Sequence, residues 1–241
     1  MFQTLTCIAL RTIKYDDRRN IVAVWTDGCG RLSLLVPAGA SREACRRRAA
    51  MMPLCIFACE ADMRPGRELV SVRDVRPAMV LPDIPTRPHK TVIALFVAEV
   101  LERLLRQTQP DRALTAFLTE SIVALDRAPD GPAVANFLPV FLYRLTTFTG
   151  IAPDTSAQGR GRFFDMRSAC FRAAPPMHPQ ALGPAEARYI SLLEAMDYGN
   201  AARVRLPAPV RRLMLNRLLE YYTLHITPLD SLHSLDVVRE L

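Results

Sequence analysis

The stretch that decides the fold is Gly30–Cys59, which reads GRLSLLVPAGASREACRRRAAMMPLCIFAC. Two apolar, strand-like runs, 32–36 and 51–59, flank a polar segment, Ser41–Arg48, that contains four arginines and one glutamate. Burying so many guanidinium groups is too costly, so they must project into solvent or onto a polyanion. We therefore predict a small barrel or sheet that displays an arginine-rich loop between its third and fourth strands.

The residues on either side of this stretch supply the other strands. Apolar and β-branched residues indicate strands at 2–14, 21–25, 32–36, 53–60 and 68–75, with a turn at Arg64–Arg67. Asp27-Gly28-Cys29-Gly30 is typical of a hairpin, because glycine adopts positive φ without steric cost. Five short strands with one long connection favour a closed barrel of the OB type, and an open five-stranded sheet is the alternative.

The pattern changes after the fifth strand. Prolines recur at Pro77, Pro82, Pro85 and Pro88, which favours an extended connector. Helical periodicity then indicates helices within 93–104, 111–125, 132–148, 184–199 and 210–225, with a short helical turn within 229–241. Pro139 implies a kink or a late start in the third of these helices, and 151–183 is expected to be a long connection. The predicted fold is α+β: an OB barrel in 1–80, a connector in 81–90 and an all-α domain in 91–241.

Charge and cysteine usage narrow the class of protein. Residues 1–76 carry 13 basic and 8 acidic side chains, whereas 77–241 carry 18 and 16, so the positive field belongs mostly to the barrel and points to a polyanionic partner. Neither a membrane span nor a secretion signal is indicated, and the six cysteines show no framework spacing. We expect a cytoplasmic protein with reduced thiols.

The candidate phosphate contacts are the arginines of the predicted loop, for which an ordinary solvated loop is the alternative. They are Arg42, Arg46, Arg47 and Arg48, with Arg11, Lys14, Arg18, Arg19, Arg31 and Arg67 as second-rank contributors. Tyr15, beside a turn, is the best candidate for stacking on a base, whereas Trp25 and Phe57 lie among apolar neighbours and are expected in the core.

Other clusters are weaker candidates. A second basic patch or an ordinary solvated helix face is indicated by Arg203, Arg205, Arg211, Arg212 and Arg217. The cysteines Cys45, Cys55 and Cys59 with His89 match no zinc signature, and buried thiols are the favoured interpretation. Cys170 and His178 lack an orienting acid in the sequence pattern, which argues against a nucleophile pair.

Several segments together resemble the RecO family of DNA repair proteins, in the form typical of the Bacteroidetes branch. They are Phe163–Phe171, Asn216–His225, Ser231–Leu241, and Gly30–Val36 followed by the arginine segment. The resemblance covers essentially the whole chain, although no single motif is catalytic or diagnostic. One departure concerns zinc: many relatives carry two Cys-x-x-Cys pairs in the C-terminal domain, whereas this chain has only Cys170 there, so no metal and no other cofactor is expected.

The resemblance implies an OB barrel, a helical C-terminal domain and a role without enzymatic chemistry. A protein of this kind binds single-stranded and double-stranded DNA and anneals complementary strands. In the RecF pathway of recombination it assists the loading of RecA together with RecR and single-strand-binding protein, in the bacterial cytoplasm at the nucleoid. An OB-type RNA-binding protein and a cysteine-dependent enzyme are the alternatives.

Overall fold

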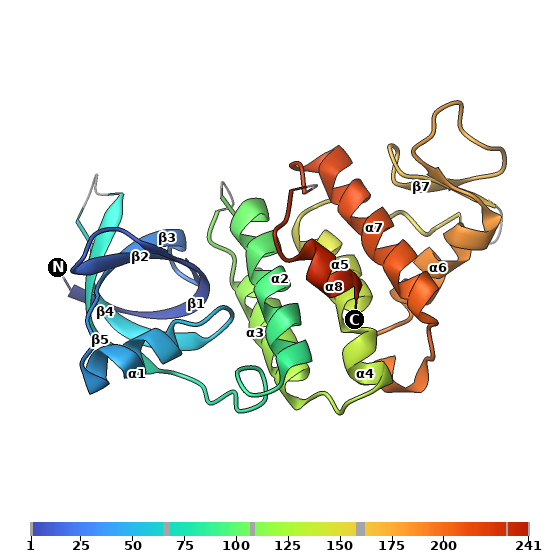
Figure 1. Ribbon diagram of the computed structural model, residues 1–241. Coiled ribbons are helices and arrows are strands. Elements are labelled where there is room, and N and C mark those ends of the chain that lie inside the picture. Colours follow the sequence, from blue (N-terminus) through green and yellow to red (C-terminus); the bar gives the residue numbers. More distant parts are fainter. Residues whose placement is uncertain (1, 65–67, 107–108, 158–161, 230, 241) are drawn as a thin grey trace. The chain divides into compact units, whose positions relative to one another are not determined.

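The computed structural model describes residues 2–64, 68–106, 109–157, 162–229 and 231–240. Its contacts divide the chain into two compact units, Met1–Asp126 with Leu232–Glu240, and Arg127–Ser231. The first unit therefore contains the barrel, two long helices and the last short helix (Figure 1). The expected turn at Arg64–Arg67 lies mostly outside the described residues.

The N-terminal part is a closed barrel with the strand order β1-β2-β3-β5-β4. The strands are β1 (Phe2–Lys14), β2 (Arg19–Thr26), β3 (Gly30–Pro37), β4 (Ile56–Asp62) and β5 (Leu69–Pro77). β1 closes the barrel by pairing with both β2 and β4, and β3 pairs in parallel with β5. The predicted closed barrel is confirmed, and the open sheet is excluded because both edges are joined.

The barrel interior is filled by alternate residues of its strands. Val22, Val24, Leu34, Val36 and Phe57 are each 0% exposed and belong to one hydrophobic cluster. Trp25 is also fully buried, with its indole N–H donating to Thr115 Oγ1 at 2.9 Å. The expectation that Trp25 and Phe57 are core residues is confirmed.

The arginine segment is a helix, and the prediction of a loop was wrong. Helix α1 (Arg42–Ala50) begins after Ser41, whose hydroxyl accepts the Ala44 N–H at 3.1 Å. Alanine and arginine favour helix, and burial of Ala44 and Ala50 supplies the tertiary packing that a nine-residue helix needs. The serine cap was visible in the sequence, but the arginines were interpreted only as loop residues.

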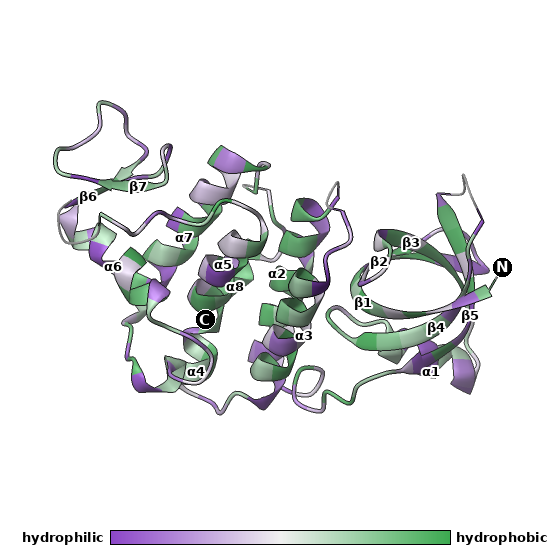
Figure 2. Cartoon of the chain, turned by 180° about the vertical axis from the view of Figure 1, so that it is seen from behind, coloured by the Kyte–Doolittle hydropathy of each residue, from purple (hydrophilic) through white to green (hydrophobic). Residues whose placement is uncertain are grey.

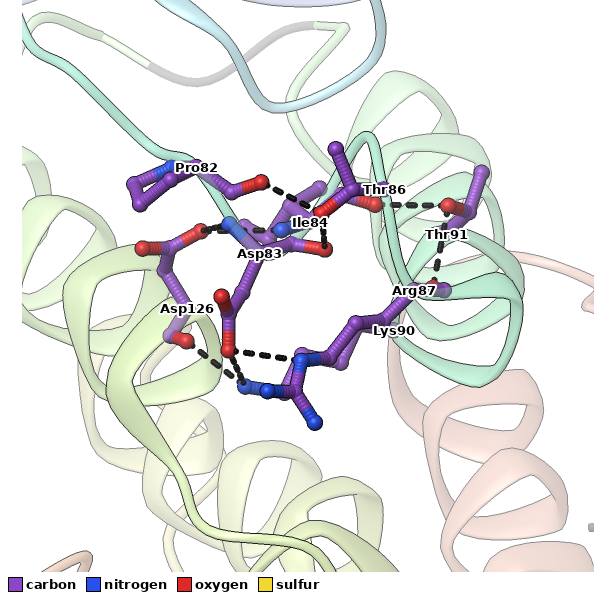
Figure 3. Close-up of polar contacts among 8 residues, drawn as sticks. All are labelled: Pro82, Asp83, Ile84, Thr86, Arg87, Lys90, Thr91 and Asp126. Carbon is purple, nitrogen blue, oxygen red and sulfur yellow. Dashed lines mark hydrogen bonds and ion pairs between the residues drawn. The ribbon is translucent and has the colours of Figure 1, made fainter.

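The proline-rich connector ends in a hydrogen-bonded network around a buried lysine (Figure 3). Lys90 is 0% exposed and donates to the Asp83 carboxylate at 2.9 Å and to the Asp126 carbonyl at 2.6 Å. The Asp126 carboxylate accepts the backbone N–H groups of Asp83 and Ile84, each at 2.9 Å. The connector is thus fixed to the helices by specific bonds, and the first long helix already begins at the last of the four prolines.

Two long helices complete the first unit with the barrel. They are α2 (Pro88–Leu104) and α3 (Arg112–Arg127), and Pro88 occupies the first turn of α2, where its missing N–H costs no bond. Asp111 caps α3 as expected, accepting the N–H groups of Ala113 and Leu114. The short C-terminal α8 (Leu235–Arg239) packs on α2, where Glu99 accepts the backbone N–H groups of His233 and Ser234.

The second unit is built on α5 and α7. Its elements are α4 (Pro132–Ala135), α5 (Phe137–Phe148), β6 (Phe163–Asp165), β7 (Cys170–Arg172), β8 (Ala181–Leu182), α6 (Pro184–Glu194), η1 (Ala201–Arg203) and α7 (Ala208–His225). The predicted third helix is divided at Asn136, whose side chain donates to the carbonyls of Ala201 and Val204. The C-terminal half was expected to be all-α. The small sheet β7-β6-β8 corrects this, and its strands are too short for a periodic pattern.

Candidate nucleic-acid interface

The end of the barrel that carries the β1–β2 hairpin also carries α1. Strand pairing places Arg19 opposite Pro37, and the Ala38 N–H donates to the Arg18 carbonyl at 2.7 Å. Helix α1 begins only four residues after Ala38. The fold therefore gathers, at one end of the barrel, two basic segments that are about 25 residues apart in the sequence.

The arginines of α1 differ in their availability to a ligand. Arg42 and Arg46, four residues apart on one helical face, are exposed, and neither has an ion pair with a described residue. Arg47 is 20% exposed and pairs with Glu43 at 2.7 Å. Arg48 donates to the Gly39 carbonyl at 3.1 Å, which holds its guanidinium near the start of the helix. Figure 2 shows the hydrophilic character of α1 beside the mainly hydrophobic β4.

The hairpin contains both paired and unpaired cations. Lys14 pairs with Asp17 at 2.9 Å, and Arg19 pairs with Asp16 at 2.7 Å. The hydrogen bond from Arg19 lowers the pKa of Asp16. Arg18 is exposed and no described carboxylate contacts its guanidinium, and Arg11 is also exposed without an ion pair to a described residue.

Tyr15 is 52% exposed at the hairpin, and the Arg19 guanidinium lies 5.2 Å from the centre of its ring. A cation beside an exposed aromatic ring leaves the ring available for stacking and adds a charge that can meet a phosphate. The sequence-based choice of Tyr15 over Trp25 and Phe57 therefore falls on the exposed aromatic side chain of the three.

Arg31 does not belong with these cations. Its guanidinium pairs with Glu102 of α2 at 3.0 Å, and the side chains are 25% and 8% exposed. The pair joins β3 to α2 within the first unit. Glu102 also pairs with Arg106 at 3.2 Å, and its side chain is buried, so the Arg31–Glu102 pair is a structural contact of the first unit.

Two of the five arginines in the basic cluster of the second unit are engaged by their surroundings. Arg217 pairs with Glu186 at 3.1 Å and with Glu220 at 2.9 Å, and Arg211 donates to the Leu206 carbonyl at 2.7 Å. Burial alone would lower the pKa of Arg217, but the two carboxylates outweigh it and raise that pKa. The remaining arginines of the cluster, Arg203, Arg205 and Arg212, are exposed.

The thiols are unbridged, and within the described residues they do not gather with other metal-ligating side chains. Within the described residues, no group of three or more His, Cys, Asp or Glu side chains could hold a metal ion, and all six cysteines are unbridged. Cys7 and Cys59 lie inside the barrel with their sulfur atoms 3.9 Å apart, and this contact together with burial raises the pKa of Cys7. Burial likewise raises the pKa of Cys55, which disfavours its reactive thiolate.

A buried carboxylate that the sequence did not single out organises the small sheet. Asp165 accepts the N–H groups of Arg167 and Ser168 and pairs with Arg172 at 3.1 Å and His178 at 3.3 Å. Cys170 contacts Ser168 instead, so the thiol and the imidazole have different partners. An open cavity of about 590 Å³ lies beside Asp165, Arg172 and His178.

No helix in the described part of the chain is long and apolar enough to cross a membrane.

Comparisons with known proteins cover both halves of the chain. The family model "Recombination protein O N terminal" matches residues 1–80, and "Recombination protein O C terminal" matches residues 85–235. Proteins called "DNA repair protein RecO" from Phocaeicola vulgatus and Bacteroides fragilis are each 36% identical over 241 and 242 residues, covering 100% of this chain and 99% of each relative. One from Porphyromonas gingivalis is 30% identical over 238 residues, covering 97% of this chain and 96% of the relative. The OB barrel, the helices that follow it in the sequence and these full-length matches show that the chain belongs to the RecO family of DNA repair proteins.

Proposed function

We propose that this protein is a non-enzymatic mediator of homologous recombination that binds single-stranded and double-stranded DNA and anneals complementary strands. The observation that carries the proposal is the group of exposed cations at the hairpin end of the barrel that form no ion pair with a described residue, above all Arg42 and Arg46 of α1. A phosphate backbone is the ligand that such a group meets best.

The proposed DNA interface, called the barrel-end cluster below, contains fewer primary contacts than the sequence indicated. Arg42, Arg46, Arg11 and Arg18 are its primary contacts because their guanidinium groups are exposed without a described ion pair. Arg47, Arg48, Lys14 and Arg19 contribute only where phosphate displaces their present partners. Arg211 and Arg212 are secondary candidates for DNA contacts. Arg31 is not included in the cluster because it pairs with Glu102.

Annealing then needs no bond-breaking chemistry. Two complementary strands repel one another through their phosphates, and cations bound between them lower that repulsion. A protein surface that holds strands loosely by charge raises their local concentration and lets base pairing select the product. Family membership supports the further proposal that RecR, single-strand-binding protein and, indirectly, RecA are partners at the nucleoid in the cytoplasm.

The test is the rate of annealing of complementary DNA strands coated with single-strand-binding protein. We expect the protein to accelerate annealing and the variant Arg42→Ala/Arg46→Ala to lose most of this effect. The matched control is Arg112→Ala/Arg127→Ala, which removes two exposed arginines from the ends of α3 and should anneal normally. No acceleration by the unaltered protein would overturn the proposal, and faster annealing of RNA than of DNA would favour an RNA-binding protein.

A further inference from the structure

The small sheet of the second unit is too short to be held together by strand pairing. β6 and β7 have three residues each and β8 has two, and β6 pairs with both of the others. Short strands that pair without further support are at best marginally stable in water. Figure 1 shows that the loop after β7 extends away from α6 and α7 before the chain returns to the sheet. Other contacts must therefore fix β7 and β8 to β6.

The side chain of Asp165, at the end of β6, supplies these contacts. Asp165 is 4% exposed, and its Oδ2 atom accepts a hydrogen bond from Arg172 Nε, at the end of β7, at 3.1 Å. Its Oδ1 atom lies 3.3 Å from Nε2 of His178, which belongs to the segment that leads into β8. One carboxylate thus joins the central strand to the end of β7 and to the segment before β8.

The same carboxylate holds the turn between β6 and β7. Oδ1 also accepts the N–H groups of Arg167 at 3.0 Å and Ser168 at 3.2 Å. In this turn Ala169 has a φ of 54°, a left-handed conformation that costs energy for a residue with a Cβ atom. Burial would raise the pKa of Asp165, but the hydrogen bonds from Ser168 and Arg167 outweigh burial and lower that pKa, so the group is ionised at neutral pH.

The C-terminal half does not offer the ligands for a structural zinc ion, which many relatives hold with two Cys-x-x-Cys pairs. Such an ion needs four ligands, usually thiolates and imidazoles. Cys170 is the only cysteine after Cys59, and its sulfur lies 3.4 Å from the Ser168 hydroxyl. The Asp165 carboxylate is already engaged by the guanidinium of Arg172, whose positive charge would repel a metal ion. Within the described residues, no three metal-ligating side chains converge on one point.

We propose that a network centred on the Asp165 carboxylate takes the place of a structural metal ion in this protein. The network consists of Asp165, Arg167, Ser168, Arg172 and His178. A metal ion joins distant segments because several ligands bind one cation. Here the signs are reversed, because one buried anion binds N–H groups and cations from three segments. The sheet then depends neither on a supply of metal nor on a thiolate that oxidation could alter.

The first test measures metal content and the effect of a chelator on the full-length protein. Elemental mass spectrometry should find far less than one zinc ion per chain. EDTA should leave hydrogen exchange within 163–182 unchanged, and so should the substitution Cys170→Ser, which would disrupt a zinc–thiolate site. One zinc ion per chain, or faster exchange of this segment after chelation, would overturn the proposal.

The second test removes the charge at the centre of the network. Asp165→Asn keeps the size of the side chain and one oxygen acceptor, but it cannot attract Arg172 and His178 with a negative charge. Hydrogen exchange within 170–172 and 181–182 should become about tenfold faster, because hydrogen bonds to a charged group are lost. The barrel strands should exchange as before. Asp154→Asn is the matched control, since Asp154 is an exposed aspartate of the same unit that accepts the Ser156 N–H and pairs with no described cation.

Two further variants test the network if Asp165→Asn does not fold. Arg172→Met removes the donor from β7 and should accelerate exchange within 170–172, whereas His178→Leu removes the contact before β8 and should accelerate exchange within 181–182. If the variants that fold all exchange like the unaltered protein, strand pairing and the packing of Phe164 against Phe171 hold the sheet, and the proposal is wrong.

Discussion

The barrel-end cluster and the basic cluster around α7 have similar sequence signatures but different surroundings. In each, several arginines occur within a few residues on a helix or beside it. At α1, Arg42 and Arg46 remain exposed without a described ion pair. Arg47 and Arg48 of the same helix are bonded to Glu43 and to the Gly39 carbonyl. At α7, Arg217 is held between Glu186 and Glu220 and Arg211 is bonded to a backbone carbonyl, whereas Arg203, Arg205 and Arg212 are exposed. The number of arginines in a segment therefore does not decide whether a guanidinium group can contact a ligand. That depends on the carboxylates that the fold places beside it.

The largest effect is expected where a cation is completely enclosed. The chain has two lysines, of which Lys90 is 0% exposed and Lys14 forms an exposed pair with Asp17. Lys90→Met should destabilise the first unit by about 2 kcal/mol, because the Asp126 carbonyl loses its donor and Asp83 keeps only Arg87 as a cation. Urea unfolding followed by circular dichroism measures it. Lys14→Met is the matched control and should unfold like the unaltered protein.

The second effect concerns binding rather than stability. Arg42→Ala/Arg46→Ala should reduce the slope of log K against log salt for a single strand by about 1.4, since each phosphate contact contributes about 0.7. The unfolding midpoint should stay the same because neither side chain has a described ion pair. Binding titrations at several salt concentrations provide the slope. An unchanged slope would mean that these two arginines face solvent only.

The third prediction concerns the second unit, where we expect a substitution to change stability and to leave DNA binding unchanged. Arg217→Ala should lower the free energy of unfolding by about 1 kcal/mol, because Glu186 and Glu220 would be left facing one another without a cation. The salt dependence of DNA binding should not change. Arg212→Ala, an exposed neighbour on α7, is the control and should leave stability unaltered. A reduced salt slope for Arg217→Ala would show that phosphate competes with its carboxylate partners.

The smallest effect tests Glu99, whose carboxylate accepts hydrogen bonds from Ser234 and His233 and also lies 3.9 Å from the Arg103 guanidinium. Burial would raise the pKa of Glu99, but the hydrogen bonds from Ser234 and His233 outweigh burial and lower it. The stabilisation is therefore present above the unfolded pKa of about 4.5 and is lost as the pH falls through the folded pKa. Hydrogen exchange should show α8 protected at pH 7 and opening below about pH 4. Glu99→Gln should open α8 at pH 7, and equal protection at both pH values would contradict the assignment.

Much of the fold could be predicted because its signals are local. Alternating apolar residues mark the five strands, and the Asp111 cap marks the start of α3. Two features were not accessible in this way. The strands of the small sheet have two or three residues each and show no period. The segment of α1 carries conflicting local signals: its four arginines favour an exposed loop, whereas its serine cap and its alanines favour the helix that forms.

The sequence predicted that the barrel carries a basic site, but it did not predict which residues belong to that site. The excess of positive charge in the first 76 residues and the exposed position of Tyr15 follow from the sequence. The pairing of Arg31 with Glu102, 71 residues away, does not follow from the sequence, and neither does the register shift between Ala9 and Arg11 in β1.

The sequence by itself determined the barrel, the helices and the basic character of the first domain, because these depend on the period of apolar residues and on the count of charges. Only the tertiary structure decided which cations are available to a ligand and which residues share a surface. The physical reason is that an ion pair and a strand register each depend on two segments at once. The sequence specifies the charge of a residue, whereas the fold determines which residue lies beside it.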